Sequence, residues 1–174
     1  MNLVSIMNKA WSYRQEFSVE RLTDISRNLI SHAYVDYLNV YQNKGYKANI
    51  PYFAYNNILI SLMGTDGDYL QGEYDSYCKT CNYMGFTPFS VDKVKETYRN
   101  LTVDNISKNI QALTNYRHEI SSDHYQAMVL GFCTFCLLGD RAFDENEYYI
   151  IRCFFDDGYD YCPSTWQQFK REWK

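Results

Sequence analysis

Residues 62–74 read LMGTDGDYLQGEY, and residues 137–148 read LLGDRAFDENEY. With Thr65 taken as an insertion, both stretches follow one pattern. An apolar run ends in glycine, an aspartate follows, an aromatic residue comes three positions later, and a Glu-Tyr pair begins the next helix seven positions after the aspartate. Repetition of a helix–turn–helix unit is an architectural signal, because each unit leaves an apolar face that its twin can cover. We therefore expect two similar helix-turn-helix hairpins.

The rest of the chain is also patterned as helices. Nearly unbroken apolar runs at 52–63 and 127–138 precede the two repeated turns and indicate buried helices. Between Leu22 and Tyr41, apolar residues recur at spacings of three or four, which predicts one long amphipathic helix from the cap Ser18 to Gly45. The predicted fold is an all-α, single-domain helical bundle of about seven to nine helices, spanning residues 1–174.

Several helix starts carry recognisable caps. Asp144 with Glu147 three positions later predicts a capping box for a helix that runs to Phe155. Pro163 predicts a last helix at 164–173. The other predicted N-caps are Ser90, Thr102 (before the apolar residues Val103, Ile106, Ile110 and Leu113), and either Ser121 or Ser122.

Composition excludes some classes of function. The 174 residues include 3 prolines and 8 glycines, too few for many short strands and their turns. A formal net charge of −4 does not suggest the dense basic face that binds nucleic acid directly. No apolar run approaches the ~20 residues of a membrane span, and the first residues do not resemble a signal peptide. We expect a cytoplasmic protein whose six cysteines are mostly reduced.

The repeated turns carry the candidate metal ligands. If the two turns meet, four carboxylates converge, and oxygen ligands suit Ca²⁺ or Mg²⁺. The alternative is ordinary helix capping, which Asp144 already offers to Glu147. The sequence predicts no capping box for Glu73, because Leu70 stands at the position of the N-cap residue. The four candidates are Asp66, Glu73, Asp140 and Glu147.

The stretch from Asp66 to Glu73 resembles the Asp-Gly-x-hydrophobic-x-x-x-Glu signature of the TerB-like (tellurite-resistance protein B) helical domain family. The second copy matches at Asp140, Phe143 and Glu147, but has Arg141 in the glycine position. The resemblance covers about residues 50–160, with 1–48 as an N-terminal helical extension and 163–174 as a C-terminal helix outside it. It implies an all-α domain of two similar halves with an acidic cation site. It also implies a non-enzymatic scaffold or sensor in stress response, phage defence or membrane-linked complexes.

Two pairs of cysteines have the spacing of a four-thiolate zinc site, Cys78 with Cys81 and Cys133 with Cys136. Both pairs fall within helical patterns, whereas zinc knuckles usually lie in tight glycine-bearing turns. We therefore expect all four, together with Cys153 and Cys162, to pack in the core as small hydrophobic side chains and not to bind zinc.

No enzymatic constellation stands out. The sequence has no Gly-x-Ser-x-Gly stretch, glycine-rich phosphate loop, dinucleotide fingerprint or His-Glu-x-x-His. His32 lies in an amphipathic helical pattern, and His118 and His124 flank a helix boundary, where a histidine commonly serves as a cap or surface residue. We expect a protein without enzymatic activity.

Acidic and aromatic residues are concentrated between 140 and 160, and exposed aromatic side chains dominate protein interfaces. The candidate partner-binding residues are Asp144, Glu145, Asp156, Asp157 and Tyr159. Two functional hypotheses follow. The first is a TerB-like, cation-binding protein-interaction module. The alternative is a phage- or mobile-element-encoded inhibitor whose acidic aromatic surface blocks a basic nucleic-acid-binding groove of a host protein. A helical scaffold without a ligand stays open beside both.

Overall fold

The computed structural model describes residues 1–64, 71–138 and 143–173, and within these ranges every regular element is a helix. The predicted all-α fold class is thus confirmed. Besides a short 3-10 helix, η1 (Arg117–Glu119), the described residues form α1 (Leu3–Glu16), α2 (Val19–Ser31), α3 (Tyr34–Asn43), α4 (Asn49–Met63), α5 (Gln71–Tyr83), α6 (Val91–Asn100), α7 (Val103–Thr114), α8 (Ser122–Cys136), α9 (Glu145–Arg152) and α10 (Trp166–Trp173).

Helix α8 forms the centre of the bundle. It contacts α1, α2, α4 and α9, and every residue from Met128 to Leu138 is buried. Its closest neighbour is α2, where a Cβ added at Gly131 would lie 2.7 Å from the backbone nitrogen of Ile30. The hydroxyl of Ser26 donates a hydrogen bond to the carbonyl of Gly131 at 3.1 Å. The first 48 residues therefore pack directly on the second hairpin.

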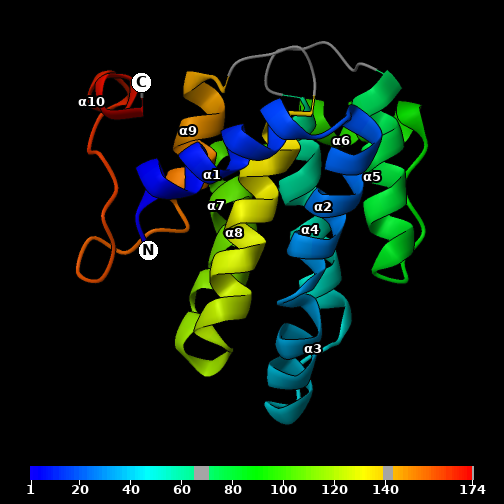
Figure 1. Ribbon diagram of the computed structural model, residues 1–174. Coiled ribbons are helices and arrows are strands. Elements are labelled where there is room, and N and C mark those ends of the chain that lie inside the picture. Colours follow the sequence, from blue (N-terminus) through cyan, green and yellow to red (C-terminus); the bar gives the residue numbers. More distant parts are fainter. Residues whose placement is uncertain (65–70, 139–142, 174) are drawn as a thin grey trace.

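The two repeated hairpins pack through their first helices. Helix α4 is almost as buried as α8, and the two are in contact. Both run toward the same end of the molecule, so that α4 and α8 end there and α5 and α9 begin there (Figure 1). Helix α4 also contacts α3, α5, α6 and α7.

The predicted N-caps are confirmed. Ser18, Ser90 and Ser121 each accept a hydrogen bond from the backbone N–H three residues later. Thr102 with Asn105 and Asp144 with Glu147 form complete capping boxes.

The long helix predicted from Ser18 to Gly45 is wrong in one respect, because it is divided into α2 and α3. At the division the N–H of His32 bonds the carbonyl of Leu29, three residues back, instead of the residue four back. Neither His32 nor Ala33 has unusual backbone angles, and no glycine or proline marks the site. This division accounts for a tenth helix among the described residues.

Two helix limits also differ from prediction. Helix α9 ends at Arg152 rather than Phe155. Helix α10 begins at Trp166, where the hydroxyl of Thr165 accepts the N–H of Gln168 at 3.1 Å. Pro163 is not inside this helix, because its carbonyl accepts the hydroxyl of Tyr148 and so holds the segment against α9.

The amphipathic α10 closes one side of the bundle with aromatic contacts. The indoles of Trp173 and Trp11 meet edge to face at 5.9 Å, and Phe169 packs on Phe143 and Tyr148. Helix α10 thereby contacts both α1 and α9. Within the described part of the chain, no helix is long and apolar enough to cross a membrane.

Candidate functional site

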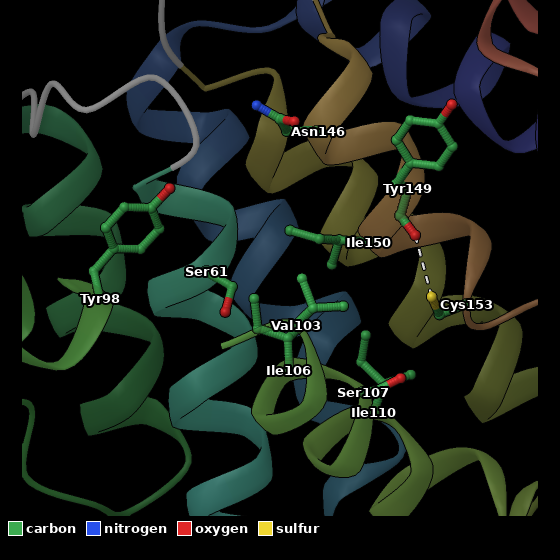
Figure 2. A pocket seen from close by; sticks show the side chains of 10 residues that line it. All are labelled: Ser61, Tyr98, Val103, Ile106, Ser107, Ile110, Asn146, Tyr149, Ile150 and Cys153. Carbon is green, nitrogen blue, oxygen red and sulfur yellow. Dashed lines mark hydrogen bonds between the residues drawn. The ribbon is translucent and has the colours of Figure 1, made fainter. Parts of the chain in front are cut away.

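A pocket of about 570 Å³ opens between four helices of the bundle (Figure 2). Helix α7 forms one wall and α9 the facing wall, while α4 and α6 contribute one residue each. The lining residues are Ser61, Tyr98, Val103, Ile106, Ser107, Ile110, Asn146, Tyr149, Ile150 and Cys153.

One face of α7 lines the pocket. Thr102 fixes the first turn, and Val103, Ile106 and Ile110 then follow at spacings of three and four on one side. Exposure falls steeply along this stripe, from 83 % at Val103 to 1 % at Ile110. The stripe therefore runs from the rim of the pocket to its floor.

Helix α9 supplies the other wall in the same way. Its capping box fixes the first turn, and Asn146, Tyr149 and Ile150 of this helix line the pocket. The side chain of Ile150 points into the space between α9 and α7, whereas the ring of Tyr149 points away from α7 (Figure 2). Tyr149 is 49 % exposed and stands at the rim. Cys153 follows one turn later, and its Sγ donates to the carbonyl of Tyr149 at 3.1 Å.

None of the ten lining residues is Asp, Glu, Lys, Arg or His. On the α4 side, Ser61 is buried and its hydroxyl donates to the carbonyl of Asn57 at 2.7 Å. The walls are mainly branched aliphatic side chains and tyrosine rings. Such a surface binds uncharged, apolar groups through the hydrophobic effect and disfavours charged ones.

Three of the cysteines are buried, and their thiols are held in the protonated form. Burial raises the pKa of Cys81, Cys133 and Cys136, and the charge of Glu147 adds to this for the last two, so these thiols stay protonated. The prediction that Cys153 packs in the core is wrong, because the residue is exposed at the pocket rim. Neighbouring atoms still crowd its sulfur enough to raise the pKa of the thiol.

Two of the four predicted metal ligands, Glu73 and Glu147, lie within the described residues. Asp66 and Asp140 lie outside them. Glu73 and Glu147 are 3 % and 0 % exposed, and each is the third residue of its helix, α5 or α9. The two hairpins therefore place their glutamates at equivalent, buried positions. In the described ranges no three His, Cys, Asp or Glu side chains are grouped to hold a metal ion.

Glu147 also has the capping role that the sequence predicts. Its Oε2 accepts the N–H of Asp144 at 3.0 Å, and Asp144 Oδ1 accepts the N–H of Glu147 at 2.7 Å.

The chain as a whole matches no protein-family model, no curated protein and no solved structure. The resemblance to TerB-like domains therefore stays a prediction that depends on the Asp66–Glu73 signature.

The predicted partner-binding residues lie at the start of α9 and in the segment after its end. Asp144 is half-buried in its capping box, whereas Glu145, Asp156, Asp157 and Tyr159 are exposed. Glu145 is the first residue of α9, which is about 12 Å long, and the other three come after the end of this helix. Tyr159, which is 74 % exposed, packs its ring 5.1 Å from that of His118.

The sequence pattern did not single out the pocket. The spacing of Val103, Ile106 and Ile110 predicts an amphipathic helix, but it equally fits a face covered by another helix. A useful signal is Val103 itself, because an apolar side chain directly after the N-cap Thr102 extends the stripe to the very end of the helix.

Proposed function

We propose that this chain is a non-catalytic protein-interaction module that receives an apolar segment of a partner protein in the pocket between α7 and α9. The observation that carries the proposal is the uncharged lining, which continues to the surface through Val103 and Tyr149. A partner helix with an apolar stripe fits this surface, because anchors on such a helix enter grooves between helices.

The exposed rim favours a protein over a small molecule. A small ligand gains most from an enclosed cavity that covers its surface, whereas this pocket opens to solvent and is flanked by a valine that is 83 % exposed. Tyrosine is enriched at the centres of protein interfaces, and Tyr149 presents both its ring and its hydroxyl there. The raised thiol pKa values agree with a binding role rather than covalent catalysis.

A photo-crosslinking amino acid at Ser107, inside the pocket, tests this proposal in cells that express the full chain. We expect a protein adduct of discrete mass. The partner identified from it, once purified, should bind Val103→Asp at least tenfold more weakly than wild type, because the carboxylate would be buried without a counter-charge. Val35→Asp is the matched control, since Val35 is also exposed, at 60 %, but lies on α3.

Three results would reject the protein partner. One is a partner that binds Val103→Asp as tightly as Val35→Asp. Another is a bound small molecule in place of a protein adduct, seen by native mass spectrometry. The third is binding that weakens steeply with salt, because an apolar contact is insensitive to salt. Steep salt dependence would support the inhibitor with its acidic surface at Glu145, Asp156 and Asp157.

A second candidate function is binding of Ca²⁺ or Mg²⁺ by the two hairpins. The specific observation is the equivalent placement of Glu73 and Glu147, each buried as the third residue of its helix. Buried carboxylates are stabilised by a nearby cation, and oxygen ligands suit these two ions. Asp66 and Asp140 would complete the site in this proposal.

Thermal unfolding of a chelator-stripped sample tests the cation. At about one hundred times the dissociation constant, Ca²⁺ or Mg²⁺ should raise the melting temperature by about 5 °C or more. Glu73→Gln, Glu147→Gln and Asp66→Asn should each remove this rise, and glutamine at 147 still serves a capping box. Glu96→Gln, at an exposed acid on α6, is the control that keeps the rise. No rise in the wild type would remove this candidate.

A further inference from the structure

Two histidines that are far apart in the sequence meet where α2 ends and α8 begins. His32 is the C-cap of α2, and His124 lies in the first turn of α8. Their ring centroids are 5.9 Å apart, with an angle of 71° between the ring planes. Helices α2 and α8 pack closely against each other at Ile30 and Gly131. His32 is exposed, and the side chain of His124 is 42 % exposed.

In each ring, the Nδ1 nitrogen makes a hydrogen bond with an oxygen atom. The Nδ1 of His32 lies 2.6 Å from the carbonyl of Asn28, and the Nδ1 of His124 lies 2.8 Å from Oδ2 of Asp36. These oxygens only accept, so in each neutral ring Nδ1 is the donor and Nε2 carries the lone pair. Asp36 is itself held in place, because the same Oδ2 accepts the N–H of Ser121 at 3.2 Å.

This pattern is the one that surrounds metal-binding histidines. A histidine that ligates a metal almost always donates its other ring N–H to a carboxylate or a backbone carbonyl, which fixes the tautomer and the ring orientation. Here the pair shows one of each, a carbonyl for His32 and a carboxylate for His124. One such contact is also usual for a capping histidine, so the feature that sets this pair apart is the second ring beside the first.

The separation of the rings also fits one shared ion. A bond from zinc to an imidazole nitrogen is about 2.1 Å, and the nitrogen lies about 1.1 Å from the ring centre, so the centres of two rings on one ion are about 5.2 Å apart at the tetrahedral angle and about 6.4 Å apart in a linear arrangement. The observed 5.9 Å lies between these two values, so a small rotation of the two solvent-accessible side chains would place both nitrogens on one tetrahedral ion.

We propose that His32 and His124 bind one divalent metal ion of the Zn²⁺, Ni²⁺ or Cu²⁺ class through their Nε2 atoms, with water in the other positions. Imidazole nitrogens suit these ions, whereas Ca²⁺ and Mg²⁺ prefer oxygen. The site is therefore separate from the carboxylates of the two hairpins. Within the described ranges, no third His, Cys, Asp or Glu joins the pair in a group that could hold a metal ion. We expect the affinity for divalent ions to follow the general order for nitrogen ligands, in which Cu²⁺ binds most tightly.

Such an ion would connect the end of α2 to the start of α8. The start of α8 is also held by Asp36 of α3, whose Oδ2 contacts both the ring of His124 and the N–H of Ser121. Bound metal stabilises the folded chain by mass action, because the unfolded chain does not hold the two rings together.

Calorimetric titration of untagged, metal-free protein with Zn²⁺ tests the site. We expect one ion per chain and a higher melting temperature with Zn²⁺. His32→Gln and His124→Gln should each weaken binding at least tenfold and remove the thermal shift. His118→Gln is the matched control and should bind as wild type, because His118 is exposed on η1 and its ring lies against Tyr159 rather than another histidine.

A second variant separates ligation from loss of structure. Asp36→Asn keeps both Nε2 atoms and should weaken Zn²⁺ binding about tenfold while one ion per chain still binds. The proposal is overturned if wild-type protein binds no Zn²⁺, or if binding is unchanged in both His32→Gln and His124→Gln, which would assign the ion to another group such as Cys153.

Discussion

At the scale of single residues, the buried charge of Asp160 is compensated by several close donors. Its side chain is 1 % exposed and accepts hydrogen bonds from Arg117 at 2.8 Å and from the amino group of Met1 at 2.7 Å. Burial alone would raise the pKa of this carboxyl. The hydrogen bonds from Arg117 and from the N–H of Asp156 outweigh burial and hold the pKa well below its usual range. Asp160 is therefore an ionised carboxylate, and its contact with Arg117 links the segment after α9 to η1.

Replacement of this carboxylate has a defined pH dependence. Asp160→Asn should lower the free energy of unfolding by about 3 kcal/mol at pH 7, because Arg117 would keep its charge without the counter-ion. The folded pKa is below that of the unfolded chain, about 3.9, so the contribution is present at neutral pH and declines as the pH falls below about 4. Urea unfolding at pH 7 and pH 3 measures both values.

The difference between wild type and Asp160→Asn should therefore narrow at pH 3. Asp157→Asn, at an exposed neighbour, should match the wild type at either pH. An equal difference at pH 7 and pH 3 would show that the carboxylate acts by packing and not by charge.

At the scale of elements, the caps explain why α7 and α9 hold the walls of the pocket in register. Both helices begin with a complete capping box, and both are short, with 12 and 8 residues. Isolated helices of this length are marginal, so their first turns depend on the cap and on packing. The division of α2 from α3 shows that a helix can also end without a sequence signal. There the N–H of His32 bonds the carbonyl three residues back, and no glycine or proline marks the position.

Thr102 gives a direct measure of the cap on α7. Thr102→Ala should lower the free energy of unfolding by about 1 kcal/mol, because the N–H of Asn105 loses its acceptor. Thr102→Ser retains that hydroxyl and should stay within about 0.5 kcal/mol of wild type. Urea unfolding of the three proteins decides the matter. A serine variant as unstable as the alanine variant would assign the effect to the methyl group of Thr102 and not to the cap.

These elements also show how far the sequence predicts the structure. Caps are local, so Ser18, Thr102 and Asp144 could be predicted from their own side chains and the residues three positions later. The division at His32 could not, since both flanking residues keep helical backbone angles. The walls of the pocket could not either, because Val103 and Ile110 have the same spacing whether or not another helix covers them. The contact of His32 with His124 depends on how α2 crosses α8, which no local pattern records.

At the scale of the whole molecule, the N-terminal and C-terminal helices are part of one core. Helix α1 packs on α8 and on α10, and the buried apolar residues form one continuous cluster that includes Leu3, Phe132 and Phe169. The repeated hairpins predict only the centre of this arrangement. The placement of α1, α2 and α10 around α8 depends on contacts between residues more than a hundred positions apart, such as Ser26 with Gly131.

A shared core predicts cooperative unfolding. Tryptophan fluorescence reports mainly the region where Trp11 meets Trp173, whereas far-ultraviolet circular dichroism reports helices throughout the molecule. Because α1 and α10 share the core with α8, both signals should change at the same urea concentration. An earlier fluorescence transition would show that the two terminal helices detach while the hairpins stay folded.

The position of Cys153 gives the native chain its own reporter. Of the six cysteines, Cys81, Cys133 and Cys136 are buried and Cys78 and Cys162 are half-buried, which leaves one exposed thiol at the mouth of the cavity between α7 and α9. An environment-sensitive maleimide dye would attach there first, at a mildly alkaline pH that compensates for the raised pKa of this thiol. The emission of the attached dye would change when a ligand enters the pocket. A ligand bound beforehand would slow the labelling, so either signal can be used to screen candidate ligands without a substitution in the chain.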